Sequence, residues 1–167
     1  GSIYPEILVK CMMSFSSVMV RRECLEEVGG FDQSFPRVVD WDLWIRIAKK
    51  YKFSGIDEIL VKRYKQPDSI TKNELTHGIE GRELIWEKYQ DDFSKNPVQM
   101  KEFRLILERK KGIHKLQQGD RTGAIKHFQR VIGLDGISIK NLGWIFISFL
   151  GRPGYTTAKL LESRTKR

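Results

Sequence analysis

The residues best suited to chemistry lie in two short stretches, which read Gly-Gly-Phe-Asp at 29–32 and Asp-Trp-Asp at 40–42. Asp40 opens a predicted helix, and a carboxylate fixed at such a point can act as a general base toward an attacking hydroxyl group. The glycines at 29–30 carry no side chain, so the backbone there can approach a bound molecule closely. Asp32 can accept hydrogen bonds from hydroxyl groups of the same molecule. These residue types are compatible with a site for a hydroxyl-bearing molecule, but by themselves they do not predict one.

A purely structural explanation of the same acids competes with this one. The segment after Asp40 has apolar residues at helical spacing, namely Trp41, Trp44, Ile45 and Ala48. Asp40 and Asp42 would then stand in the first helical turn, where carboxylates cap free N–H groups and favour the helix dipole. Asp42 and Arg46 are four residues apart and would pair on the helix surface. The two Asp residues do not predict a metal site, because residues two apart on a helix do not face each other.

The elements that position these residues are predicted to mix strands and helices. Short strands are predicted at 14–20, 53–56 and 59–64, where Val, Ile and aromatic residues are frequent or alternate with polar ones. Residues 22–28 predict a short helix that ends at Gly29-Gly30 in a left-handed cap.

The remainder of the chain is predicted to be helical throughout, at 74–91, 97–117, 121–133, 137–150 and 155–165. Gly119-Asp120 separates two of these helices, and Ala124, Phe128 and Ile132 follow at four-residue spacing. This arrangement resembles one tetratricopeptide unit. A single unit needs neighbours to bury its faces, so a helix pair packed on its own domain is favoured over a peptide-binding groove.

These predictions give an α+β fold class that is predominantly α, with a few short strands followed by a helical C-terminal region. The domain boundary is placed near residue 73, giving domains at 1–73 and 74–167.

Composition excludes several classes of protein. The 167 residues are 40% apolar and 11% aromatic, which is enough for a packed core and argues against disorder. Two cysteines, Cys11 and Cys24, do not make a disulfide scaffold. The most apolar stretch, Trp144–Leu150, has seven residues and is too short to span a bilayer. Gly1-Ser2 is typical of an expression scar, and a cytoplasmic location is expected.

The order and spacing of the motifs resemble a known family. The stretches SSVMVRRECLEEVGGFDQSF and VVDWDLWIRIAKKY are similar to the acceptor-side half of family 2 inverting glycosyltransferases, which have the GT-A fold. The resemblance covers roughly residues 3–73 and makes the first domain part of a GT-A domain. It implies transfer of a sugar from a nucleotide-sugar donor to a carbohydrate or lipid-linked acceptor hydroxyl, with inversion, in the synthesis of cell-envelope polysaccharide.

The resemblance also implies a role for individual residues. Asp40 matches the catalytic base, while Gly29, Gly30, Asp32 and Arg46 match acceptor-side positions. The Glu that usually precedes the base is Val39 in this sequence. The family's Arg-x-His near the metal is Arg63-Tyr64-Lys65, so these two cations become candidate contacts to the diphosphate rather than metal ligands.

The nucleotide-binding half of such an enzyme, with its Asp-x-Asp motif at a strand end, is expected to precede residue 1. The divalent metal, Mn²⁺ or Mg²⁺, is expected there, and no metal is expected in this chain. The chain is therefore predicted to be the C-terminal part of the enzyme and inactive alone, with exposed strand edges that favour a homodimer.

The net charge of +9 is concentrated in the second half, since residues 73–167 carry 18 basic and 11 acidic side chains. Nucleic acid is not the expected partner, because the sequence lacks a recognition-helix motif and an aromatic stacking platform.

A non-enzymatic helical module that binds a protein or an anionic membrane is the alternative function. The tail supports it through the apolar cluster Trp144, Ile145, Phe146, Phe149 and Leu150 and the basic residues that follow. Packing of the same aromatic residues in a core is the competing explanation.

Overall fold

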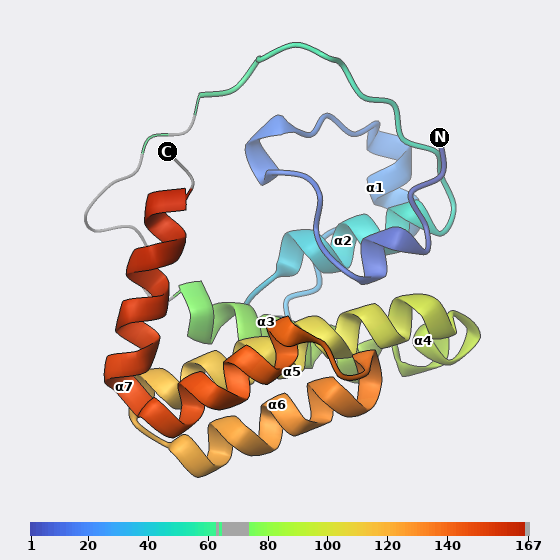
Figure 1. Cartoon of the computed structure of the whole chain (residues 1–167). Coiled ribbons are helices and arrows are strands. Elements are labelled where there is room, and N and C mark those ends of the chain that lie inside the picture. Colours follow the sequence, from blue (N-terminus) through green and yellow to red (C-terminus); the bar gives the residue numbers. More distant parts are fainter. Residues whose placement is uncertain (63, 65–73, 166–167) are drawn as a thin grey trace. The chain divides into compact units, whose positions relative to one another are not determined.

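The computed structural model describes residues 1–62, 64 and 74–165, and it describes side chains for all of them except 74 and 158–165. Within these residues the chain forms the 3-10 helices η1 (Glu6–Leu8) and η2 (Phe15–Ser17) and the α-helices α1 (Arg22–Val28), α2 (Val39–Ala48), α3 (Glu74–Lys88), α4 (Gln90–Lys95), α5 (Pro97–Gln118), α6 (Arg121–Asp135) and α7 (Ile139–Thr165) (Figure 1). The chain divides into two compact units, Gly1–Phe103 and Arg104–Arg167. The domain boundary predicted near residue 73 falls at the edge of the stretch 65–73, outside the described residues, and stays a prediction.

The predicted α+β class is wrong, because the described residues contain helices and no strand. At 14–20 the chain instead makes the turn η2, where the Ser17 N–H and the Ser17 hydroxyl both donate to the Ser14 carbonyl, at 2.9 and 2.8 Å. Serine side chains that bond to nearby backbone in this way compete with a strand ladder. Backbone at Val18 is extended without a partner strand, and the described parts of 53–56 and 59–64 likewise form no ladder. The alternation of apolar and polar residues in these stretches therefore indicated extended backbone but not pairing in a sheet. With no strand in the described residues, the homodimer predicted through strand edges loses its basis.

The core of the first unit forms where α2 meets the helices that follow it in sequence. Helix α2 is buried on nearly every side, with Leu43 and Ile45 fully enclosed. Three aromatic rings contributed by α3, α4 and α5 pack together, with centroids 5.1 Å apart for Trp86–Phe93 and 4.7 Å for Phe93–Phe103. Such rings bury large apolar areas and dominate the stability of a small core.

The N-terminal segment joins this core through side-chain donors. Ile7 and Leu8 are fully buried, so their backbone needs partners. The Trp41 indole donates to the Ile7 carbonyl, and the Arg82 guanidinium donates to the Val9 carbonyl, each at 2.6 Å. Arg82 lies over the rings of Trp41 and Phe103, and desolvation lowers its pKa to about 10. A buried cation thus takes the place of a backbone ladder in holding this segment.

The second unit is a helical assembly around Phe128. Its ring stacks on that of Trp144 at a centroid distance of 5.4 Å, next to the buried Leu116 and Ala124. The predicted Gly119-Asp120 turn is confirmed: Gly119 has a φ of +86°, and the Asp120 side chain caps α6 by accepting from the Gly123 N–H at 2.8 Å.

Helix α7 runs through the two stretches predicted as separate helices and is kinked between them. Gly151, with φ 69° and ψ −148°, interrupts the helical geometry two residues before Pro153. No helix in the described part of the chain is long and apolar enough to cross a membrane.

Candidate functional site

The start of α2 is set by an unusual backbone conformation at Val38. This residue has a φ of +54°, in the left-handed region that β-branched residues rarely adopt. Its side chain fits over Gly81 of α3, where an added Cβ would stand 2.5 Å from Val38 Cγ1. The Val38 carbonyl accepts from the Asp42 N–H at 3.1 Å and so begins the helix. Packing therefore holds a strained residue two positions before Asp40, as is common at functional sites.

Asp40 lies at the edge of an open hollow. Its carboxylate is half-buried, and Oδ1 accepts from the Trp41 N–H at 2.9 Å. The hollow, of about 680 Å³, is lined by polar and sulfur-bearing side chains as well as apolar ones, namely Cys11, Met12, Met13, Ser14, Phe15, Ser16, Asp40, Val61 and Lys62. Among the described residues that line it, Asp40 is the single carboxylate. The hollow thus has one acidic residue in its lining, together with two serines and a lysine.

The pKa of the Cys11 thiol depends on the burial and the charge around this hollow. Burial raises its pKa, and the nearby charge of Asp40 raises it further, while donation to the Met13 carbonyl at 3.3 Å lowers it. The thiol is therefore held protonated beside the carboxylate, which does not suit it to nucleophilic chemistry.

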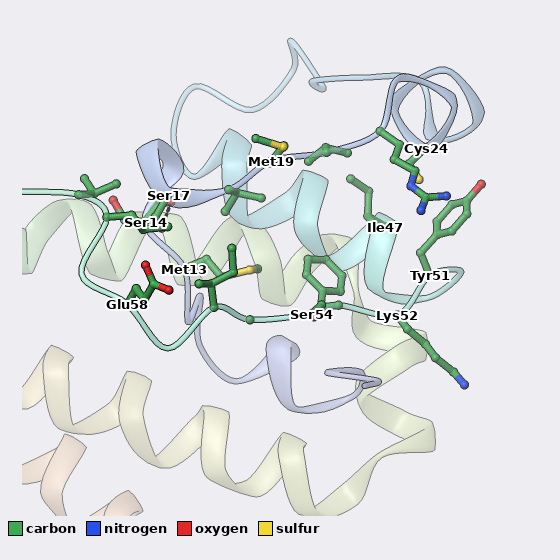
Figure 2. A pocket seen from close by; sticks show the side chains of 18 of the residues that line it. Met13, Ser14, Ser17, Met19, Cys24, Ile47, Tyr51, Lys52, Ser54 and Glu58 are labelled. Carbon is green, nitrogen blue, oxygen red and sulfur yellow. Dashed lines mark hydrogen bonds between the residues drawn. The ribbon is translucent and has the colours of Figure 1, made fainter.

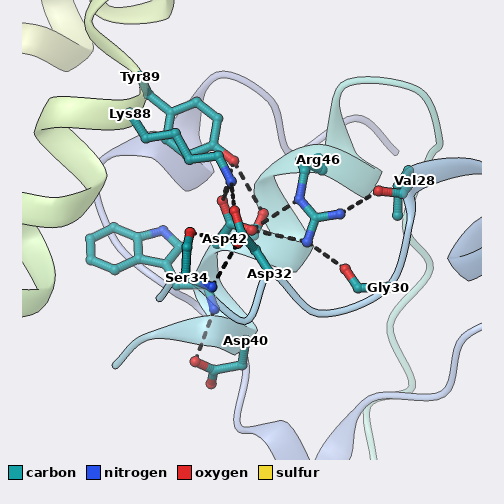
Figure 3. Close-up of polar contacts among 10 residues, drawn as sticks. Val28, Gly30, Asp32, Ser34, Asp40, Asp42, Arg46, Lys88 and Tyr89 are labelled. Carbon is teal, nitrogen blue, oxygen red and sulfur yellow. Dashed lines mark hydrogen bonds and ion pairs between the residues drawn. The ribbon is translucent and has the colours of Figure 1, made fainter. Parts of the chain in front are cut away.

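Asp42 has a different environment from Asp40. It is fully buried, and its carboxylate accepts from Arg46 Nε at 2.9 Å and from the Tyr89 hydroxyl at 2.7 Å. Lys88 Nζ lies 2.7 Å from the same carboxylate. Burial, followed by the bond to Asp42, raises the pKa of Tyr89, so this hydroxyl stays a donor. Asp42 pairs with Arg46 as expected (Figure 3), but the expected position on the surface is wrong, since the Asp42 side chain is fully buried and that of Arg46 is 20% exposed.

Arg46 holds the turn at Gly29-Gly30, called the glycine turn below, against α2. Its Nη1 donates to the Val28 carbonyl at 2.5 Å, and its Nη2 donates to the Gly30 carbonyl at 2.6 Å. Gly29 ends α1 with a φ of +81°, as predicted, and Gly30 follows with +64°. With its donors directed to Asp42 and to these carbonyls, Arg46 shapes the turn.

Asp32 is tied to the same network through α3. Its carboxylate accepts from Lys88 Nζ at 2.7 Å and from the Ser34 hydroxyl at 2.6 Å. The Lys88 bond first, and then the Ser34 bonds, hold the pKa of Asp32 well below its ordinary value. Lys88 thus bridges Asp32 and Asp42, and the structure brings the predicted acceptor-side residues into one network (Figure 3).

A second hollow lies next to the segments at 13–24 and 51–61. It has a volume of about 970 Å³ and is lined mainly by side chains from 13–24 and 51–61 (Figure 2). Met19 and Ile59 at its rim are each 97% exposed. It contains none of the predicted site residues.

Lys88 and Tyr89 were missed by the sequence analysis. The sequence of α2 could have predicted that Asp42 is buried. Leu43 and Ile47 lie opposite Trp41 and make the helix apolar all round, which is typical of a buried helix. A carboxylate inside such a helix has to be paired. The candidate diphosphate contacts Arg63 and Lys65 lie outside the described residues.

The geometry of the two Asp residues gives no place for a metal. Figure 3 shows the carboxylates of Asp40 and Asp42 directed to different sides of α2. Nowhere in the described chain do three or more His, Cys, Asp or Glu gather in a way that could hold a metal ion. The divalent metal implied by the resemblance is expected in the nucleotide-binding part and stays a prediction.

Residues 4–66 match glycosyltransferase like family 2. The matched region contains the glycine turn, Asp32, Asp40, Asp42 and Arg46, and so covers most of the site described above. The match supports a relationship to that family and a glycosyltransferase function in general. Searches of curated proteins and of solved structures gave no match.

Proposed function

We propose that this chain forms the acceptor side of an inverting glycosyltransferase, with Asp40 as the general base. The observation that carries the proposal is the position of Asp40, which lies within the matched region and borders an open, partly polar hollow. Oδ1 is oriented by the first turn of α2. No hydrogen-bond partner of Oδ2 is found among the described residues, so this oxygen is the one we assign to the acceptor.

In the proposed reaction the acceptor hydroxyl oxygen attacks the anomeric carbon as the bond to the nucleoside diphosphate breaks. The hydroxyl proton passes to Asp40, and the diphosphate leaves with the electron pair of the broken bond. A single displacement from the opposite face inverts the anomeric centre, and one carboxylate at the hollow suits such a step. The network of Asp42, Arg46 and Lys88 holds the glycine turn against α2, the helix that also carries the base.

The donor is assigned to a nucleotide-binding part outside the described residues, located with this chain in the cytoplasm. Support comes from the extended stretches at 18–21 and 53–61, which carry exposed apolar side chains such as Met19 and Ile59. Such surfaces are suited to being covered by further protein. The acceptor is a carbohydrate or a lipid-linked hydroxyl.

The test is Asp40→Asn in the enzyme that contains the nucleotide-binding part. Release of nucleoside diphosphate from a panel of UDP- and GDP-sugars should fall by roughly 10²–10⁴-fold, with the fold unchanged by circular dichroism. The matched control is Asp91→Asn, an exposed acid that also stands in the first turn of a short helix. Turnover of Asp40→Asn within about threefold of wild type would refute the assignment, as would an equal loss in the control. Micromolar binding of a nucleotide sugar by this chain alone would refute the assignment of the donor to another part.

A further inference from the structure

Helix α7 carries a row of large apolar side chains that face solvent. Their exposed fractions run from 48% to 91%, for Ile139, Leu142, Phe146, Phe149 and Leu150. At about 100° per residue these five positions fall within an arc of roughly 100°, so they form one stripe about 17 Å long. We call it the α7 stripe.

The opposite side of α7 is used for folding. Ser148 and Asn141 are buried there, and Trp144 stacks on Phe128. The apolar cluster predicted in the tail is thus divided: Trp144 and Ile145 pack against the core, whereas Phe146, Phe149 and Leu150 remain exposed. The α7 stripe is therefore not needed for the core of its own unit.

The stripe ends at a fixed point. Gly151 breaks the helical geometry with a positive φ, and an added Cβ there would stand 2.4 Å from Arg121 Nε. Next to the kink, Arg152 Nε donates to the Gln117 carbonyl at 2.7 Å. The apolar row is therefore a helical segment that ends at Gly151.

The positive charge of the protein belongs to the same unit as the stripe. Residues 104–167 contain 14 Lys and Arg against four Asp and Glu, a net charge of +10, whereas residues 1–103 contain 16 against 17. Between Asp135 and Glu162 the sequence has no acidic residue. The exposed basic residues of α6 and α7 include Lys126, Arg130, Lys140 and Arg152.

We infer that the α7 stripe lies in the interface of an anionic lipid bilayer, with the surrounding basic side chains on the lipid phosphates. A helix with an apolar face rich in Phe and Leu and basic flanks is suited to lie in the plane of the bilayer surface. Nucleic acid would use the charge but not five exposed apolar side chains. The lack of any acidic residue in the sequence between Asp135 and Glu162 favours contact with an anionic surface. This inference is independent of the proposed glycosyltransferase function.

The test is sedimentation of the whole chain with sucrose-loaded vesicles. Phosphatidylcholine vesicles with about one-quarter phosphatidylserine should carry the protein into the pellet at about 0.05 M NaCl, and the bound fraction should fall at about 0.5 M. Vesicles of pure phosphatidylcholine should bind it at least about tenfold more weakly.

Substitutions in the α7 stripe test whether its apolar side chains, and not the positive charge alone, are needed for vesicle binding. The double substitution Phe146→Gln with Phe149→Gln should lower the partition coefficient on anionic vesicles by about tenfold or more, because two rings leave the interface. Ile139→Gln, at the most exposed position of the stripe, is the second variant, with a smaller loss in the same direction. The control is Met19→Gln with Ile59→Gln, two residues of the first unit that are each 97% exposed, and it should bind like wild type.

Several results would overturn the inference. Wild type that stays in the supernatant with anionic vesicles at low salt would do so, and so would equal binding to neutral vesicles. Binding by the Phe146 and Phe149 double variant equal to that of wild type would exclude the stripe as the contact. A dimer in sedimentation velocity that this double variant dissociates, without vesicle binding, would show that a second copy of the chain covers the stripe instead.

Discussion

Substitution of Asp42 by Asn gives the sharpest test of the buried network. Four donor groups converge on this carboxylate, namely Arg46 Nε, Arg46 Nη2, Lys88 Nζ and the Tyr89 hydroxyl, at 2.7–2.9 Å. The Asn amide has one acceptor oxygen, and its NH₂ group faces donors, so about two donors lose their acceptor. Because Asp42 is fully buried and Arg46 only 20% exposed, solvent does not replace these bonds. The free energy of unfolding should fall by about 3–5 kcal/mol.

The assay is urea unfolding followed by tryptophan fluorescence, since three of the four tryptophans, Trp41, Trp44 and Trp86, lie in the first unit. Tyr89→Phe removes one donor and leaves the carboxylate its other partners, so we expect a loss of about 1–2 kcal/mol. Asp91→Asn on the exposed face of α4 should change stability by less than about 0.5 kcal/mol. A loss below about 1 kcal/mol for Asp42→Asn, or one no larger than that of Asp91→Asn, would refute the buried ion network.

Two further predictions concern neighbours of the site. Gly81→Ala should destabilise the chain by about 1–3 kcal/mol in the same urea assay, because the new methyl group meets Val38, and Val38→Ala in the same chain should recover part of the loss. Full stability of Gly81→Ala alone would contradict the close approach. Asp32 has a pKa below its ordinary 3.8 when folded, so its ion pair contributes stability that is fully present above that value and is lost as the pH falls below it. The advantage of wild type over Asp32→Asn in free energy of unfolding should therefore shrink from about pH 5 toward about pH 2.5, and a constant or growing advantage would contradict the depressed pKa.

The sequence predicted α3, α5 and α6 to within a few residues, because their apolar spacing and the Gly119-Asp120 turn are local signals. It did not predict α4, and it divided α7 into two helices on either side of the kink. It failed on the strands, which depend on a partner that no local pattern specifies. At 14–20 the alternation was present, but Ser14 and Ser17 close a turn instead.

The site shows the same division between local and distant information. The left-handed cap at Gly29 follows from residue type and was predicted. The burial of Asp42 was not, because it depends on Lys88 and Tyr89, which lie 46 and 47 positions away in sequence. The contrast between a half-buried Asp40 and a fully buried Asp42 thus comes from tertiary packing rather than from their nearly identical sequence surroundings.

The attachment of the N-terminal segment by Trp41 and Arg82 has a consequence for the order of folding. Their hydrogen bonds to the Ile7 and Val9 carbonyls span 34 and 73 residues. Closing such long loops costs chain entropy before any contact is gained, so we expect these bonds to form after the local helices. During synthesis the segment around Ile7 and Leu8 would wait for α3 before docking, with these two side chains exposed until then. The segment that contains Ile7 and Val9 would thus be among the last parts of the first unit to reach its native place.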